Sequence, residues 1–175
     1  MVFQHFFTKA SMLHNKSFSE KLLSEILISA KEMGLMVCCD VIIFNDNKEI
    51  FIQKRSGQRK LYPNCWEVPG GHVEENESIL ETLSRELKEE TDMTLIHIVD
   101  YIDSFDWQKQ DGTKCRNFQF LAEAEGIPRI EANKSTEFRW IKKGEEEILL
   151  DNRAAGDTSH YEIIKKAFEI LHKYV

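Results

Sequence analysis

Residues 71–93 read GHVEENESILETLSRELKEETDM, and most of this stretch has the pattern of one amphipathic helix. Between Ser78 and Thr91 there is no Gly or Pro, and apolar residues recur at spacings of three and four, at Ile79, Leu80, Leu83 and Leu87. Helix formers with this period place their apolar side chains in one stripe. The sequence predicts a helix over 78–91.

Four glutamates accompany this helix: Glu77, Glu86, Glu89 and Glu90. At about 100° per residue, Glu90 falls within the apolar arc, Glu86 lies at its edge and Glu89 about 60° further round. A solvated helix face accounts for the position of Glu81, but not for Glu86 and Glu90, which point toward the packed side. Carboxylates about 4 Å apart repel by roughly 4 kcal/mol at an effective dielectric near 20, so converging ones need protons or a divalent cation. Oxygen-only sites suit Mg²⁺ or Mn²⁺, which predicts a hard-metal phosphate site.

The spacing of these residues resembles the signature of a known family. The pattern G-x5-E-x7-R-E-L-x-E-E, from Gly71 to Glu90, is similar to the box of the Nudix (MutT-like) hydrolases, and residues 66–71, WEVPGG, look like its lead-in. Matches of this kind arise by accident on the order of once per million windows. One position departs from the pattern, because Asp92 stands where the family has Gly. Asp tolerates the left-handed conformation of a helix C-cap, but it adds an anion beside the proposed metal.

The resemblance implies a role for each matching residue. The expected Mg²⁺ ligands, with Mn²⁺ as the alternative ion, are Glu86, Glu89, Glu90 and the carbonyl of Gly70. One of the three glutamates would serve as general base, and Arg85, which could pair with Glu81 or Glu89, would orient the carboxylates. The expected catalytic residues are therefore Glu86, Glu89, Glu90 and Arg85, and the expected substrate-binding residues are Arg55, Gly70 and Gly71.

The resemblance also implies an activity. A Nudix pyrophosphohydrolase would cleave the diphosphate linkage of a nucleoside diphosphate derivative or a nucleoside triphosphate. One alternative is a catalytically silent Nudix module that binds a nucleotide or a partner protein. A second, an enzyme similar to isopentenyl diphosphate isomerases, is disfavoured because Gly70 replaces the Cys expected before Gly71-His72, and Cys65 lies far upstream.

Other possible site residues each have a structural interpretation as well as a functional one. Glu77 suits the start of a helix, where an anion complements the helix dipole. His72 beside a turn is typical of a surface residue, and Glu131 and Glu137 are weak candidates for a base from a later loop. Four strand aromatics could include one that stacks on a base, although such residues usually belong to the core: Phe105, Trp107, Phe118 and Trp140.

Composition limits the classes of partner. The chain has 175 residues, of which 42% are hydrophobic, a length and content typical of one domain. Its net charge of −7 argues against nucleic acid or an anionic membrane as a partner and favours a small-molecule nucleotide bound through local positive charge or metal. Four cysteines without a CxxC pair, and no apolar run of about 20 residues, predict a cytoplasmic protein with reduced thiols.

The order of patterns along the chain predicts the architecture. We expect a helix over 18–33 capped by Ser17 or Ser19, a β-hairpin of 36–44 with 49–55, a strand pair of 96–107 with 114–123, and a strand at 138–141. Helices follow at 145–150 and 161–174, the last with a Ser159–Glu162 capping box. Residues 1–34 would be an N-terminal helical extension that packs on the domain or across a homodimer, and residues 35–175 the Nudix domain. With the resemblance, the expected fold is α/β, an α/β/α sandwich around a mixed β-sheet.

Overall fold

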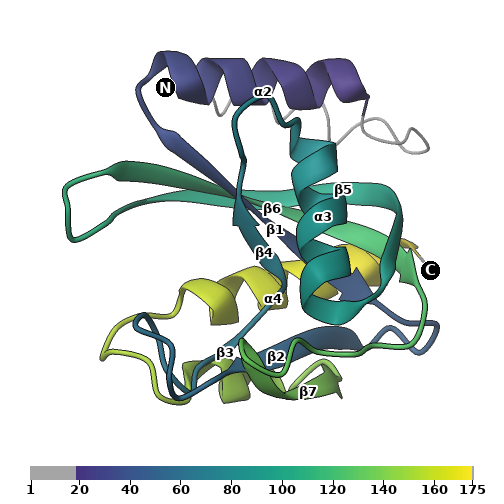
Figure 1. Ribbon diagram of the computed structural model, residues 1–175. Coiled ribbons are helices and arrows are strands. Elements are labelled where there is room, and N and C mark those ends of the chain that lie inside the picture. Colours follow the sequence, from purple (N-terminus) through teal and green to yellow (C-terminus); the bar gives the residue numbers. More distant parts are fainter. Residues whose placement is uncertain (1–18, 175) are drawn as a thin grey trace.

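A mixed sheet of seven strands lies between helices in the computed structural model, which describes residues 19–174 (Figure 1). The strands are β1 (Met36–Phe44), β2 (Ile50–Arg55), β3 (Trp66–Glu67), β4 (Gly70–His72), β5 (Thr94–Gln108), β6 (Lys114–Glu125) and β7 (Ser135–Ile141). Their order is β3-β2-β1-β6-β5, with β4 paired to β1 and β7 to β2. β1 runs parallel to β6, while the other pairs are antiparallel, so the sheet is mixed.

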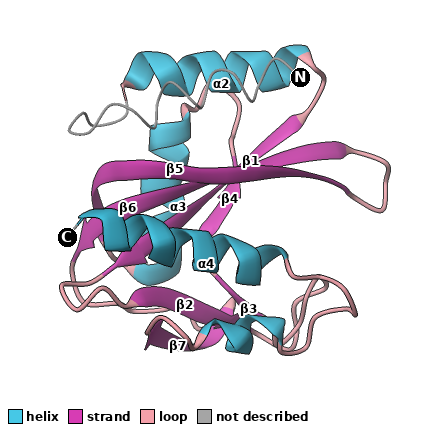
Figure 2. Cartoon of the chain, turned by 180° about the vertical axis from the view of Figure 1, so that it is seen from behind, coloured by secondary structure: helices cyan, strands magenta, loops and turns pink. Residues whose placement is uncertain are grey.

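Helices cover both faces of this sheet (Figures 1 and 2). On one face, α2 (Glu20–Glu32) and α3 (Ile79–Thr91) pack with Cys39, Val41 and Phe118 in one core cluster. On the other face, α4 (Ser159–Leu171) packs with Ile42 and Leu121 in a second cluster. Short 3₁₀ segments follow β7 at Glu146–Leu150 and end α4 at His172–Tyr174. The predicted α/β/α sandwich with a mixed sheet and an N-terminal helix is confirmed.

Local sequence explains where α2 and α3 begin and end. Ser19 caps α2 by accepting a hydrogen bond from the Leu22 amide at 3.3 Å, whereas Ser17, the other predicted cap, lies outside the described residues. Ser78 and Glu81 form a capping box at the start of α3. α3 ends at Asp92, whose φ of 59° is the left-handed conformation predicted for this position.

Two predictions about connections were wrong in detail. The expected hairpin turn forms, but β1 and β2 pair only at Phe44 and Ile50, because β4 takes the edge of β1 beyond that point. The capping box predicted for Ser159 and Glu162 is absent, since α4 is capped at Thr158 without a side-chain bond and the Ser159 hydroxyl donates to Asp157. The first error concerns a tertiary neighbour, β4, and the second a local one, because Asp157 precedes Ser159 by two residues.

The state of the cysteines and the length of the helices within residues 19–174 relate to the expectations drawn from composition. All four cysteines, Cys38, Cys39, Cys65 and Cys115, are buried free thiols. None of the helices in this range is both long enough and apolar enough for a membrane crossing.

Candidate functional site

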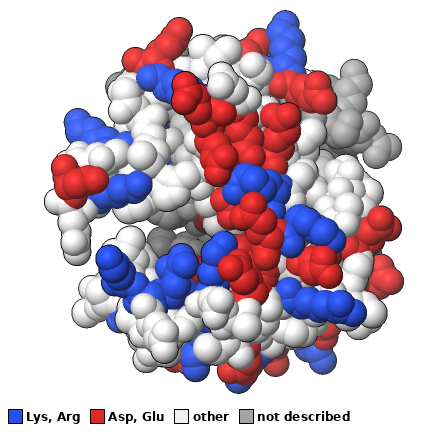
Figure 3. Space-filling model, in the orientation of Figure 1, with Lys and Arg blue, Asp and Glu red and all other residues white. Residues whose placement is uncertain are grey.

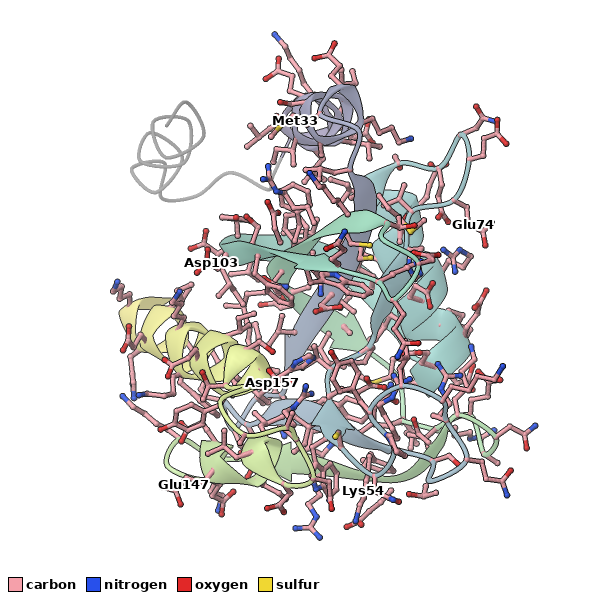
Figure 4. All side chains as sticks on the ribbon, turned by 90° about the vertical axis from the view of Figure 1, so that its left-hand side faces the viewer. Met33, Lys54, Glu74, Asp103, Glu147 and Asp157 are labelled. Atoms are coloured by element: carbon pink, nitrogen blue, oxygen red, sulfur yellow. The ribbon has the colours of Figure 1, made fainter. Side chains whose placement is uncertain are left out.

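A cleft of about 630 Å³ opens beside the central strand. Its walls come from the β5–β6 hairpin, the β2–β3 connection, β4, the inner side of α3 and the segment before α4. Figure 3 shows the indentation between the projecting β5–β6 hairpin and the part of the molecule that carries β2 and β3. In Figure 4, Asp157 lies at this opening just before α4, and Asp103 lies on β5. Strands far apart in the sequence thus contribute to one concave site.

Glu90 is the most deeply held carboxylate of the cleft. One oxygen, Oε2, accepts hydrogen bonds from the Gly70 amide at 3.2 Å and from Gln53 Nε2 at 2.8 Å. Burial, followed by the negative charges of Glu67 and Glu86, raises the pKa of Glu90 to about 8. The site therefore carries more negative charge than its protein groups neutralise, which a proton or a cation would balance.

Arg85 holds the neighbouring carboxylates. Its guanidinium donates to both oxygens of Glu77, at 2.7 and 2.9 Å, and to Oε1 of Glu86 at 2.7 Å. It also lies 3.7 Å from Glu89 Oε2, so the pairing expected with Glu89 forms. The alternative pairing with Glu81 does not appear, because that side chain caps the helix. Figure 3 shows basic atoms in the middle of an acidic band over α3, which matches this arrangement.

The three candidate metal ligands do not converge equally. Glu86 and Glu90 line the cleft, whereas Glu89 is not among its lining residues and its side chain is 47% exposed. Within residues 19–174, no three His, Cys, Asp or Glu side chains come together as a complete metal cluster. The donors that do face the cleft are carboxylate oxygens close to Gly70, and this chemistry fits Mg²⁺ or Mn²⁺ better than a soft metal.

Gly70 and Gly71 allow the backbone of β4 to approach these groups. A Cβ at Gly71 would overlap the Glu86 carboxylate, and one at Gly70 would lie 2.5 Å from the Cys39 carbonyl oxygen and overlap Asp40. Neither glycine has a positive φ. The need for glycine at both positions therefore comes from the close approach of neighbouring atoms and not from the backbone conformation.

Arg55 lies in the cleft, as its proposed role requires, but an internal partner engages it. Its NH1 donates to both oxygens of Glu67, at 2.8 and 2.6 Å, and its Nε donates to the Leu61 carbonyl. Arg59 and Lys134 also line the cleft, so positive charge gathers in the same cavity as the carboxylates. Sequence reasoning missed Glu67 as a site residue, although it belongs to the WEVPGG lead-in.

The weaker candidates fall into two groups. Glu77 does not cap α3, since Ser78 does; it binds Arg85 and the Thr82 hydroxyl instead. Glu131 pairs with Lys134 and Glu137 with Arg139, and neither glutamate lines the cleft. Of the remaining candidates, those that line the cleft are His72, Phe105 and Trp107. Phe118 and Trp140 pack in or against one core cluster, and Phe105 also packs against the other.

Cys65 does not replace the cysteine of an isomerase-like site. It is fully buried, donates to the Asn152 carbonyl at 3.2 Å and is not part of the cleft lining. Cys38 does line the cleft, but burial raises the pKa of its thiol to about 12. Both thiols are therefore held in the protonated form.

Sequence reasoning also missed two buried polar residues of the cleft, Asp40 and Asn117. Asn117 Nδ2 donates to Asp40 Oδ2 at 2.6 Å. Burial raises the pKa of Asp40 to about 7, while hydrogen bonds from Asn117 and Gln119 act in the opposite direction. Their signal in the sequence was a polar residue at inward positions of two otherwise apolar strands.

Known proteins resemble this chain at the levels of sequence and fold. An m7GpppN-mRNA hydrolase of Xenopus laevis is 35% identical over 80 residues, which are 46% of this chain and 27% of that protein. An ADP-ribose pyrophosphatase of Methanocaldococcus jannaschii is 35% identical over 81 residues, 45% of this chain and 46% of that protein. These matches span less than half the length of either relative.

Solved structures share the fold at lower sequence identity. The MutT protein of Methanosarcina mazei Go1 superposes with a TM-score of 0.64 at 18% identity, covering 79% of this chain and 96% of that one. The Nudix domain of Shewanella oneidensis NrtR superposes with a TM-score of 0.60 at 21% identity, covering 78% and 88%. The model of the NUDIX domain matches residues 34–166, a range that contains the sheet, α3 and the whole cleft lining. With the box in its expected helix and a fold shared along most of its length, this chain belongs to the Nudix family.

Proposed function

We propose that this protein is a metal-dependent hydrolase that cleaves the diphosphate linkage of a nucleoside diphosphate derivative or a nucleoside triphosphate. The observation that carries the proposal is the presence of two carboxylates, Glu86 and Glu90, in a cleft that Arg55, Arg59 and Lys134 also line. Anionic phosphates need positive charge in a chain whose net charge is −7. A cleft lined by both carboxylates and cationic side chains suits a phosphate chain together with its counter-ion.

The metal would be Mg²⁺ or Mn²⁺, held by Glu86, Glu89, Glu90 and the Gly70 carbonyl. When bound, such an ion neutralises phosphate charge and lowers the pKa of a coordinated water. The chain's own groups have separate tasks. Arg85 orients Glu86, and Gln53 with the Gly70 amide orients Glu90, so two ligands are held before substrate arrives. Glu89 would join them after a change of side-chain position, because it does not line the cleft and pairs with Arg85.

The reaction would be attack of water on one phosphorus of the anhydride, with departure of the other phosphoryl group. A carboxylate of the site would accept the proton of the water, and the guanidinium of Arg55 or Arg59 would neutralise the phosphate oxygens. Positioning and electrostatic stabilisation account for most of the catalysis in reactions of this class. The products would be a nucleoside monophosphate and the remaining phosphorylated fragment.

The names of similar proteins support a nucleotide substrate. ADP-ribose pyrophosphatase and m7GpppN-mRNA hydrolase both describe hydrolysis of a nucleotide derivative, and the solved NrtR domain is a complex with ADP ribose. We therefore include ADP-ribose in the first substrate panel, beside nucleoside triphosphates and nucleotide sugars.

The decisive experiment measures turnover of this panel with and without Mg²⁺ or Mn²⁺, for the wild type, Glu90→Gln and Glu89→Gln. We expect metal-dependent release of a nucleoside monophosphate and a loss of at least about a hundredfold for Glu90→Gln. Glu147→Gln, an exposed change on the 3₁₀ segment after β7, is the matched control (Figure 4). Full turnover in both site variants, with melting temperatures unchanged, would contradict the assignment.

A catalytically silent nucleotide-binding module is the second candidate, and the outward position of Glu89 favours it. Such a module would bind nucleotides but show no turnover on any substrate with either metal. Calorimetric binding of ADP-ribose without hydrolysis would therefore select this function over the first.

We also propose that residues 1–34 form an extension to a Nudix domain of residues 35–175. In the described part of the extension, α2 buries Leu23, Ile26 and Leu27 in the cluster that contains α3. Deletion of residues 1–34 should lower the melting temperature, because this apolar face would be exposed. Sizing of the full chain tests whether the extension also joins two copies.

A further inference from the structure

Three polar residues interrupt an apolar face of the sheet beside the candidate active site. Side chains at alternate positions of a strand share a face. On β1, Asp40 precedes Ile42 by two positions, and on β6, Asn117 and Gln119 precede Leu121 in the same way. Ile42 and Leu121 belong to the cluster under α4, so the face is apolar further along both strands. The polar group is therefore local to the cleft.

Strand register places this group in two rows across four strands. In one row, Phe105 of β5 lies opposite Asn117, which lies opposite Cys38 and then His72 of β4. In the next row, Gln119 lies opposite Asp40, which lies opposite Gly70. Since neighbouring strands are about 4.8 Å apart, Asn117 lies about 10 Å from the strand that carries Gly70. This distance places Asn117 beside the carboxylates but not among them.

The hydrogen bonds of the group are incomplete. The Asn117 amide nitrogen donates to Asp40 Oδ2 at 2.6 Å. A carboxylate accepts hydrogen bonds, so the NH₂ group of Asn117 faces Asp40 and its amide oxygen faces elsewhere. Asn117 Oδ1 is buried and has no hydrogen-bond donor within residues 19–174. An unsatisfied buried acceptor costs about 1–3 kcal/mol, which a donor from a ligand would recover.

Aromatic side chains lie beside the Asn117 oxygen. Phe105 and Trp107 line the same cleft and are only partly buried. Phe105 lies directly opposite Asn117 in the antiparallel register, where side chains of two strands are in contact. Because the Asn117 oxygen is buried, a donor reaches it only when a bordering side chain shifts. Phe105, which is partly buried and packs against the cluster under α4, is the residue opposite Asn117. An aromatic wall beside hydrogen-bond acceptors suits a planar base that carries a donor.

We propose that Asn117 Oδ1, supported by Asp40 and bordered by Phe105, receives the exocyclic amino group of the nucleobase, so that the site selects adenine or cytosine over hypoxanthine or uracil. The inference rests on the proposed function in that it assumes a nucleotide in this cleft. A base with a carbonyl oxygen in place of the amine would direct its lone pairs at the Asn117 oxygen and leave it unsatisfied. Selectivity therefore follows from the side-chain orientation that Asp40 imposes.

The test compares binding of nucleoside monophosphates, which contain no anhydride and so report binding apart from hydrolysis. Calorimetric dissociation constants are measured for AMP against IMP and for CMP against UMP, with the wild type, Asn117→Leu and the exposed control Gln110→Ala. We expect the amino-bearing ligand to bind the wild type and the control about tenfold more tightly. In Asn117→Leu both ratios should fall to about one to two, because an apolar side chain of similar size has no acceptor.

Several outcomes would overturn the proposal. These are equal binding of AMP and IMP by the wild type, an unchanged preference in a folded Asn117→Leu protein, and no binding of any nucleotide. Weaker binding of 2′-deoxy-AMP than of AMP, with equal binding of AMP and IMP, would overturn it as well. The Asn117 oxygen would then accept a hydrogen bond from the ribose hydroxyl and not from the base. If Asn117→Leu does not fold, N6,N6-dimethyl-AMP on the wild type removes the donor instead, and tight binding of that ligand would refute the proposal.

The two proposals fail separately. Preference for AMP over IMP without turnover on any substrate supports base selection and rejects the hydrolase. Turnover without such a preference retains the hydrolase and rejects base selection.

Discussion

Arg85 binds the Glu77 carboxylate through two hydrogen bonds, of 2.7 and 2.9 Å, across the first two turns of α3. The same guanidinium donates to Glu86 and to the His72 carbonyl at the end of β4. One cation thus joins the segment before α3, the strand that carries Gly70 and Gly71, and a cleft carboxylate. The planar fork of Arg suits this set of acceptors, and the point charge of Lys does not.

Replacement of Arg85 by Lys should therefore reduce both stability and activity. We expect a loss of about 1–3 kcal/mol in the free energy of unfolding, because hydrogen bonds to charged groups are removed. Turnover should fall by at least about tenfold, since Glu86 loses its orientation. Urea unfolding and steady-state kinetics measure the two effects. Lys21→Gln, an exposed change on α2, is the control, and wild-type kinetics in Arg85→Lys would contradict the positioning role.

The Glu77–Arg85 pair should also make stability depend on pH. Hydrogen bonds from Arg85 lower the pKa of Glu77 from its ordinary 4.5 to about 2. The folded protein therefore binds this proton less readily than the unfolded chain. The stabilisation is complete above the unfolded pKa and is lost as the pH falls toward the folded value.

The difference in unfolding free energy between the wild type and Glu77→Gln should accordingly be largest near about pH 7 and shrink toward about pH 3. Subtraction of the two curves removes the contribution of other acids that titrate in both proteins. A difference that stays constant over this range would show that Glu77 stabilises the fold by packing and not by charge.

Gly70→Ala should disrupt the contact between β1 and β4. The new Cβ would lie 2.5 Å from the Cys39 carbonyl oxygen, and a backbone atom cannot turn aside. Overpacking of this kind costs about 1–3 kcal/mol, and displacement of the Gly70 amide would release Glu90. Thermal melting and turnover should both fall. Gly57→Ala is the matched control, because its nearest neighbour is the Asn64 side chain at 3.0 Å, and equal losses in the two variants would contradict the packing argument.

Asp92→Gly restores the family residue at the end of α3 and should leave turnover within about twofold of the wild type. The Asp92 side chain is exposed and pairs with Lys88 at 2.5 Å, so it does not add its charge to the cleft. Stability should not fall, because Gly adopts the left-handed conformation without strain, whereas Asp92→Ala should lose about 1 kcal/mol. A tenfold change in turnover for Asp92→Gly would show that the anion acts on the site after all.

Local patterns predicted α3 well, and long-range contacts limited the other predictions. The apolar period of residues 79, 83 and 87 and the Asp92 cap needed no knowledge of the rest of the chain. The same reasoning placed a capping box at Ser159, where the structure has none, and missed the one at Ser78. A serine followed by Glu three residues later satisfies the pattern in both places, and the path of the preceding chain selects between them.

The amino-acid sequence was sufficient for the family box and for the inward direction of Glu86 and Glu90, because these depend on spacing within one helix. The mixed sheet between helices was expected from the resemblance to the Nudix family, with which the order of elements is compatible. Other features depend on which elements become neighbours in the fold. They are the pairing of Arg55 with Glu67, the buried pair of Asp40 and Asn117, and the outward position of Glu89. Partners such as Asp40 and Asn117 lie 77 residues apart in the chain, and strand register alone brings them together. Side-chain periodicity acts within a segment, whereas hydrogen-bond partners and burial are properties of the packed sheet.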